Sequence, residues 1–227
     1  MKNSQSVGTP RADFVGICQG RKGIRKRRIM LQPITQSTLY ESLEALPEGV
    51  TGEILNGQLH TQPRPSFPHG RVSFLLAAKV GPYDDGIGGG PGGWWIFTEP
   101  EVHFVRNVEV VVPDLAGWRR ERMPYPPEDQ RCEVVPDWVC EILSPSTASK
   151  DRELKMPLYA HYGVQYAWLI DPAKRMLEAY RLDAGVWVEV GRFATVDQVV
   201  APPFEAVSID LESLWLPRRP RLVEPSG

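Results

Sequence analysis

Two acidic residues stand where an apolar strand gives way to irregular chain. Asp114 follows the run VEVVVP, and Glu141 lies near the end of WVCEIL, just before Ser144. If the two strands are neighbours, their carboxylates converge at one edge of a sheet, where burying them is costly unless a cation pairs with them. Hard oxygen ligands of this kind suit Mg²⁺ or Mn²⁺. The two positions therefore indicate a candidate site for a divalent cation.

A lysine follows at a spacing that could complete such a site. Lys155 comes 14 residues after Glu141, and Asp151 lies four residues before Lys155, on the same face of a predicted helix. Two acids, a metal and a lysine suffice for hydrolysis of a phosphodiester. The metal neutralises the phosphate and lowers the pKa of a bound water, while the lysine stabilises developing charge or orients the nucleophile.

The same residues also have purely structural interpretations. Asp151 and Lys155 could form an i,i+4 pair on the helix surface, which is worth a few tenths of a kcal/mol. Glu141 could take part in a salt bridge, and Asp114 could cap a turn. Spacing alone leaves these alternatives open beside the metal site.

These residues belong to a chain of ordinary globular composition. Its 227 residues are 42% hydrophobic and 24% charged, enough for one main domain with a sizeable core. No apolar run approaches the roughly 20 residues that a membrane span requires, and the first residues lack the apolar core of a secretory signal. We therefore expect a cytoplasmic protein without a membrane partner.

The three cysteines suit a reducing compartment. They are too few and too irregularly spaced for a disulfide framework or a CxxC metal site. Cys140 is expected to pack inside its apolar strand, and Cys132, which stands among charged residues, is expected to be exposed.

The charge is distributed unevenly along the sequence. The first 29 residues hold eight of the 26 Lys and Arg and one of the 28 Asp and Glu, which leaves 18 bases and 27 acids after them, a balance of −9. The RKGIRKRR run could bind phosphate backbones or an anionic surface. It could equally be a disordered leader, or a stretch added upstream of a start at Met30. The remaining chain carries no general electrostatic signature of a nucleic-acid binder.

The order of the predicted elements indicates a mixed α/β sheet with helices on its faces. The expected elements are a short helix from Thr35, a hairpin turning at Asn56-Gly57, a helix opened by His69, a glycine-rich loop over 84–93, strands within 94–105, 107–118 and 137–145, a helix over 150–162, a strand at 166–172, a hairpin across 183–185, and a closing segment at 207–217. Ser149 is expected to cap the helix over 150–162 and Gly163 to end it, while Pro157 should distort it.

A set of short motifs resembles one protein family. The segment SPST, with Asp151, Lys155, Tyr159, the Gly163-Val164 pair and WLIDP after it, is similar to the Uma2 family, also called DUF820. That family is described as restriction endonucleases of the PD-(D/E)XK nuclease superfamily. Upstream pieces agree with it, namely GEILNG around Glu53, His69 at a helix start and Pro113-Asp114 after a β-run.

The resemblance covers roughly Thr35 to Leu216. It implies a restriction-endonuclease-like fold, with a mixed β-sheet flanked by helices. Three parts are then expected along the chain: a basic, disordered leader over 1–34, a nuclease domain over 35–216 and a loose tail over 217–227.

The resemblance also implies roles for individual residues. Asp114 looks like the acid of the PD half-motif and central metal ligand, Glu141 like the second acid, and Glu53 like an acid that completes the metal shell. Lys155 looks like the catalytic lysine. His69 and Asp151 match family positions that could add to the site, although His69 could instead serve the start of its helix.

The sequence departs from the family pattern in two places. In the strict (D/E)XK motif a lysine stands two residues after the second acid, where this chain has Leu143, so the lysine is expected to have moved onto the helix as Lys155. Relatives usually read GVxEYW, whereas residues 163–168 read GVQYAW, which lacks the Glu-Tyr pair.

Together these features imply a Mg²⁺- or Mn²⁺-dependent DNA endonuclease. A homodimer is expected, because cutting both strands of a duplex calls for two sites and an isologous dimer supplies them. Two alternatives stay open: a non-catalytic nucleic-acid-binding or regulatory module that keeps the fold, and a structural or mobile-element-associated protein without its own substrate. Affinity for Mn²⁺ that depends on Asp114 would separate the nuclease from both.

Overall fold

The computed structural model describes residues 38–62, 64–84, 89–195 and 197–218. The chain divides into two units, residues 1–36 and 37–227, and the second unit holds all the elements below. The predicted leader over 1–34, the helix start at Thr35 and most of the predicted tail lie outside the described residues. In the part of the chain that the structure describes, no helix has the length and apolar character needed to cross a bilayer.

The described residues of this unit form helices, short helical turns and thirteen strands. In chain order they are α1 (Leu39–Glu44), β1 (Thr51–Leu55), β2 (Gln58–Gln62), α2 (Phe67–Val80), the 3₁₀ turn η1 (Gly81–Tyr83), β3 (Trp94–Thr98), β4 (Glu101–Val105), β5 (Glu109–Val111), β6 (Leu115–Arg119), β7 (Arg131–Cys132), β8 (Trp138–Ile142), α3 (Ala148–Lys150), the π-helical turn η2 (Asp151–Lys155), α4 (Met156–Tyr162), β9 (Tyr166–Asp171), β10 (Met176–Asp183), β11 (Val186–Ala194), β12 (Gln198–Val199), β13 (Ile209–Asp210) and the 3₁₀ turn η3 (Glu212–Leu214).

The strands form three sheets where the sequence predicted one. A six-stranded sheet has the order β11-β10-β9-β8-β6-β3, a five-stranded sheet has the order β2-β1-β5-β4-β7, and β12 pairs with β13. Both larger sheets are mixed, because β8 runs parallel to β9 and β4 parallel to β7, while their other pairs are antiparallel. The predicted class, a mixed α/β fold with helices on its sheets, is confirmed.

The chain changes sheets at two prolines. The predicted strand over 94–105 is in fact β3 and β4, separated at Glu99-Pro100, and the one over 107–118 is β5 and β6, separated at Pro113-Asp114. Proline has no backbone N–H to donate to a neighbouring strand, so strand pairing tends to break where it occurs. The second break places Asp114 at the crossing between the two large sheets.

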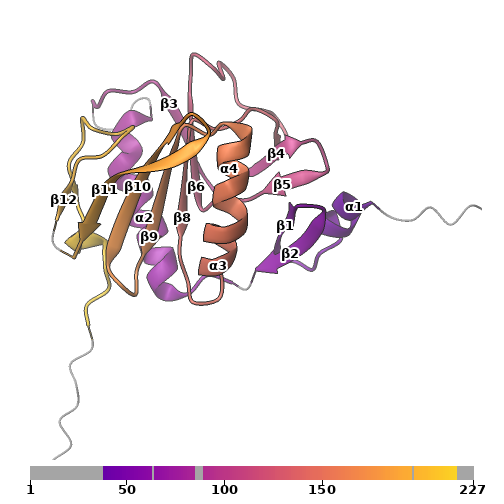
Figure 1. Cartoon of the computed structure of the whole chain (residues 1–227), viewed down its shortest axis with the longest axis horizontal. Coiled ribbons are helices and arrows are strands. Elements are labelled where there is room, and N and C mark those ends of the chain that lie inside the picture. The colour runs from indigo at the N-terminus through magenta and orange to yellow at the C-terminus, as the bar shows by residue number, and fades with distance from the viewer. Residues whose placement is uncertain (1–37, 63, 85–88, 196, 219–227) are drawn as a thin grey trace, which may run out of the picture. The chain divides into compact units, whose positions relative to one another are not determined.

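Helices cover both faces of the six-stranded sheet (Figure 1). On one face Val72, Leu76 and Val80 of α2 pack against Trp138, Cys140 and Ile142 of β8. On the other face α4 packs over Val139 of the same strand. Successive side chains of a strand point to opposite faces of the sheet, so Glu141 lies on the same face as Val139, the face that α4 covers.

The two predicted hairpins are confirmed. Asn56 and Gly57 have φ of 51° and 72°, the positive values that a type I′ turn needs, and Leu55 pairs with Gln58 across them. The second hairpin turns at Ala184-Gly185, between β10 and β11.

Three local predictions are corrected by the structure. Cys132 is buried rather than exposed, because its thiol packs against Met123, whereas Cys140 is buried as expected. Helix α2 begins at Phe67, two residues before His69, since Pro68 is tolerated in a first helical turn. The helical segment near 150 begins at Ala148 after Thr147, so Ser149 does not cap it. Gly163 does end it, with φ of 83°.

Candidate active site

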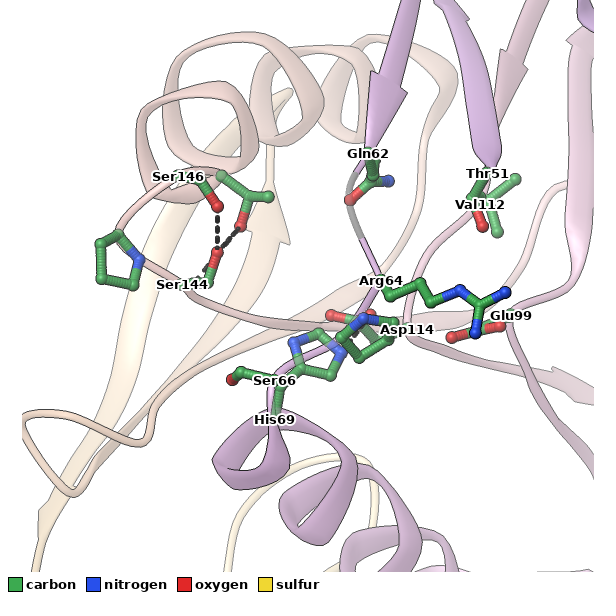
Figure 2. Close-up of a pocket in the computed structure, with 13 residues that line it drawn as sticks. Thr51, Gln62, Arg64, Ser66, His69, Glu99, Val112, Asp114, Ser144 and Ser146 are labelled. Carbon is green, nitrogen blue, oxygen red and sulfur yellow. Dashed lines mark hydrogen bonds and ion pairs between the residues drawn. The ribbon is translucent and has the colours of Figure 1, made fainter. Parts of the chain in front are cut away.

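Asp114 lies beside the end of β8, as the sequence predicted. Leu115, the next residue, pairs with Cys140 across the antiparallel β6–β8 ladder. One carboxylate oxygen, Oδ2, accepts the backbone N–H of Ile142 at 2.6 Å. The other oxygen, Oδ1, lies 2.9 Å from Nε2 of His69, in the first turn of α2 (Figure 2). Asp114 is therefore held from two directions, and His69 belongs to its immediate surroundings.

Glu141 and Lys155 meet inside the protein, on the α4 face of the sheet. The Lys155 side chain is 1% exposed, and its Nζ lies 2.7 Å from Oε1 of Glu141. The same Nζ lies 2.8 Å from Oε1 of Glu53 and donates to the carbonyl of Val112 at 3.1 Å. Tyr159 adds a donor, because its hydroxyl hydrogen-bonds the same Glu141 oxygen. Lys155 thus bridges two of the predicted acids.

A π-helical turn just before Pro157 sets the direction of Lys155. Residues Asp151–Lys155 form η2, and Pro157 follows in the first turn of α4, where its missing N–H is tolerated. Asp151 and Lys155 are 3% and 1% exposed. The interpretation of these two residues as a surface pair is therefore wrong, and the distortion expected from Pro157 leaves Lys155 facing the acids.

Glu53 is a fully buried carboxylate surrounded by donors. Its Oε1 accepts the backbone N–H of Val112 at 2.9 Å besides the contact with Lys155. Its Oε2 lies 2.5 Å from Nζ of Lys150 and accepts the side-chain amide of Gln62 at 3.0 Å. Lys150 and Lys155 are five residues apart, the spacing at which a π-helical turn brings side chains together. Both lysines therefore reach one acid.

Burial and charge act in opposite directions on these groups. Burial would raise the pKa of Glu53, but Lys155 and Lys150 hold it below its ordinary value. Burial raises the pKa of Glu141 well above its usual range, and Lys155 only partly offsets this. Burial also raises the pKa of Asp151. For Lys155, burial is outweighed by Glu141 and Glu53, which raise its pKa.

Acidic and basic groups are packed closely at this site. The carboxyl groups of Glu53, Asp114, Glu141 and Asp151 lie near the ammonium groups of Lys150 and Lys155 and near the imidazole of His69. Burial would lower the pKa of His69, but its hydrogen bond to Asp114 raises it. The positive groups thus offset part of the negative charge that the acids bring together.

A pocket of about 240 Å³ opens beside Asp114. The side chains of Asp114 and His69 are 17% and 14% exposed, whereas Glu141 and Lys155 are buried. The pocket is lined by Thr51, Gln62, Arg64, Pro65, Ser66, His69, Glu99, Val112, Asp114, Ser144, Pro145, Ser146 and Thr147 (Figure 2). Of the two acids near the end of β8, Asp114 is the one that lines the pocket.

The acidic side chains of this site suit a hard divalent cation only in part. Carboxylate oxygens are the ligands that Mg²⁺ and Mn²⁺ prefer. Among the residues that the structure describes, however, no group of three or more His, Cys, Asp or Glu is arranged to hold a metal. Both oxygens of Glu53 are taken by other donors, so this acid could join a metal shell only by giving up a lysine contact. Asp114 lines the pocket, but its two oxygens are also held, by the Ile142 N–H and by His69, and Oε1 of Glu141 contacts Lys155 and Tyr159.

The sequence did not predict roles for two residues that contact the buried acids, Tyr159 and Lys150. Tyr159 was part of the family motif without a role, although its place four residues after Lys155 puts both on one helical face. Lys150 was expected only as a helix start, and nothing in its spacing pointed to Glu53, because an ordinary α-helix would separate it from Lys155 around the helix axis.

The comparisons with known proteins bear on the family and on the fold. The Uma2 family model, described as "Putative restriction endonuclease", matches residues 38–212. A solved structure described as a "putative nuclease belonging to DUF820 from Anabaena variabilis ATCC 29413" is 22% identical and superposes with a TM-score of 0.62, covering 79% of this chain and 98% of its own. That likeness shows a shared fold. A search of curated proteins found no match. The match over residues 38–212 means that the chain belongs to the Uma2 family.

Proposed function

We propose that this protein is a metal-dependent DNA endonuclease that hydrolyses phosphodiester bonds with Mg²⁺ or Mn²⁺. The observation that carries the proposal is the contact of Lys155 with Glu141, next in sequence to Ile142, whose N–H holds the pocket-lining acid Asp114. Membership of the Uma2 family supports the same class of reaction.

Asp114 and Glu141 would hold the cation. When bound, it would neutralise the phosphate and lower the pKa of an attacking water. The Ile142 N–H and His69 fix the orientation of the Asp114 carboxylate. Lys155 supplies a preorganised positive charge beside Glu141, which is worth more in a buried site than in water.

Glu53 has a supporting role in this proposal. It holds the Lys155 ammonium group together with Glu141 and balances its charge. Ligation of the metal by Glu53 would require one of its lysine contacts to open. A homodimer would supply one such site for each strand of a duplex.

Plasmid cleavage tests the proposal. Supercoiled DNA is incubated with the protein and Mn²⁺ or Mg²⁺, beside Asp114→Asn, which keeps an acceptor for the Ile142 N–H, and Lys155→Ala. Asp183→Asn is the matched control, because Asp183 is exposed at the β10–β11 hairpin. Cutting that needs metal should fall by at least about 100-fold in both site variants, the usual cost of removing one electrostatic contributor, and persist in the control.

A non-catalytic nucleic-acid-binding module is the second candidate. It is favoured by the internal satisfaction of the charges, since Lys155 is already paired with two buried acids. That reading predicts DNA binding without cutting and no Mn²⁺ affinity that depends on Asp114. Such a result would overturn the endonuclease.

A further inference from the structure

Two phenylalanines on α2 are exposed to an unusual degree. Phe67 is 92% exposed and Phe74 is 72% exposed, and both lie on the face of the helix that points away from the core residue Leu76. Phe67 stands in the first turn, where the following Pro68 fixes the backbone. Large aromatic side chains left in water indicate a binding surface when they occur together with complementary groups.

Arginines lie near the Phe67 end of this aromatic surface. Arg71 lies between the two phenylalanines in sequence and hydrogen-bonds the carbonyl of Ser213 at 3.5 Å. Arg175 donates to the carbonyl of Leu216 at 2.7 Å, and Arg218 follows two residues later in the same segment and is exposed. The guanidinium groups of Arg71 and Arg175 are thus held by backbone carbonyls, which leaves their charge uncompensated by these contacts.

The surface continues from the candidate active site. A hollow of about 600 Å³ is lined by Pro65, Ser66, Phe67, Gly70, Arg71 and Leu216. Pro65 and Ser66 also line the pocket that contains Asp114 and His69. A chain that leaves this pocket over Ser66 would therefore run directly onto Phe67 and Arg71.

We infer that the α2 surface, formed by Phe67, Arg71 and Phe74, binds unpaired bases of a DNA strand next to the bond that is cut. Phenylalanine rings accept bases of any sequence by stacking, and arginine guanidinium groups take the phosphates between them. In a duplex the bases are already stacked on each other, so this surface favours single-stranded segments. The inference rests on the proposed function and specifies its substrate.

Binding of fluorescent oligodeoxythymidine to the full-length protein tests this inference. A chelator keeps the probe intact, and a duplex of equal length serves for comparison. Phe67→Ala and Phe74→Ala should each weaken single-strand affinity about 10-fold, within the range measured for loss of one stacked base. Both changes remove exposed side chains, and alanine favours the helix. Tyr125→Ala is the matched control, because Tyr125 is 87% exposed and lies outside α2.

A second readout separates this surface from the basic residues 1–29. A probe that carries 5-bromouracil is irradiated, and the crosslinked peptides are identified by mass spectrometry. Crosslinks to Phe67 or Phe74 are expected. Unchanged affinity in both variants, with crosslinks confined to other segments, would overturn the inference.

The outcomes for the surface and for the nuclease differ. The protein could cut DNA with metal while its affinity for single-stranded DNA stays the same in Phe67→Ala and Phe74→Ala. That result would refute the binding role of the α2 surface and leave the proposed endonuclease activity standing. If DNA affinity depends on the two phenylalanines but the protein does not cut DNA, the binding role of the α2 surface is supported and the proposed nuclease activity is refuted. A change of oligomeric state in the variants, with no change in DNA affinity, would assign the surface to a second copy of the chain and also refute the inference.

Discussion

Lys155 Nζ lies 2.7 Å from Oε1 of Glu141, although the two residues belong to different elements, η2 and β8. Leu143, two residues after Glu141 and just past the end of β8, packs in the core cluster on the α4 face of the sheet. The π-helical turn η2 directs the Lys155 ammonium group to Glu141. The positive charge beside Glu141 is therefore supplied by the helical segment that packs on the sheet and not by the strand itself.

Replacing Lys155 by methionine should destabilise the fold strongly. The change leaves Glu53 and Glu141 buried without their shared cation, and removing one partner of a buried pair costs about 3–5 kcal/mol. Urea unfolding followed by circular dichroism measures the loss.

Lys150→Met is the control for this experiment. Glu53 then keeps Lys155, and the Lys150 side chain is 14% exposed, so we expect a loss of roughly 2 kcal/mol at most. Equal losses in the two variants would contradict the assignment of Lys155 as the central cation.

Tyr159→Phe should lower both stability and the proposed cleavage activity. The change removes only the hydroxyl that donates to Glu141, at a cost of about 1–3 kcal/mol for a buried hydrogen bond to an acid, and keeps the ring against Phe104. Thermal unfolding and plasmid cutting are measured together. Tyr162→Phe is the comparison, since Tyr162 stacks on the same phenylalanine. A Tyr159→Phe protein as stable as the Tyr162→Phe protein would show that the bond contributes nothing.

The site was predictable where it depends on neighbouring strands. Asp114 and Glu141 each end an apolar run, and the pairing of β6 with β8 brings Asp114 to the end of β8, where it accepts the Ile142 N–H. The hairpin at Asn56-Gly57 was equally local, because two positive φ values leave few residue choices.

The features that the sequence did not predict depend on pairing between strands that are far apart in the sequence. Glu53 reaches Lys155 because β1 joins β5, through Ile54 opposite Val110, and no local pattern encodes that partner. The division into two large sheets has the same origin. Cys132 was misjudged because its charged neighbours in sequence point to solvent while its thiol turns to Met123.

Glu53→Gln should show how stability depends on pH. The two lysines lower the pKa of folded Glu53 below its ordinary value of 4.5, so the ionised form stabilises the fold above that pH. This contribution is lost as pH falls through the lower, folded pKa. Wild type should therefore be more stable than Glu53→Gln at neutral pH, and the difference should shrink below about pH 4.5. Urea midpoints across that range measure it, and a difference that stays constant with pH would count against the lysine contacts.

Asp151→Asn should behave in the opposite way. Burial raises the pKa of folded Asp151 above its ordinary value of 3.8, so its ionised form opposes folding. The protonated Asp151 carboxyl stabilises the fold fully below pH 3.8, and this contribution is lost as the pH rises through the higher pKa of the folded state. The asparagine cannot ionise, so the variant should gain on wild type with rising pH and have the higher melting temperature at neutral pH.

The exposed Asp183→Asn change is the control for this experiment and should give no such gain. If Asp151 also serves the proposed reaction, the Asp151→Asn protein will be more stable and cut DNA more slowly. A neutral-pH melting temperature below that of wild type would instead mean that Lys155 and Thr147 stabilise the ionised carboxylate more than burial destabilises it.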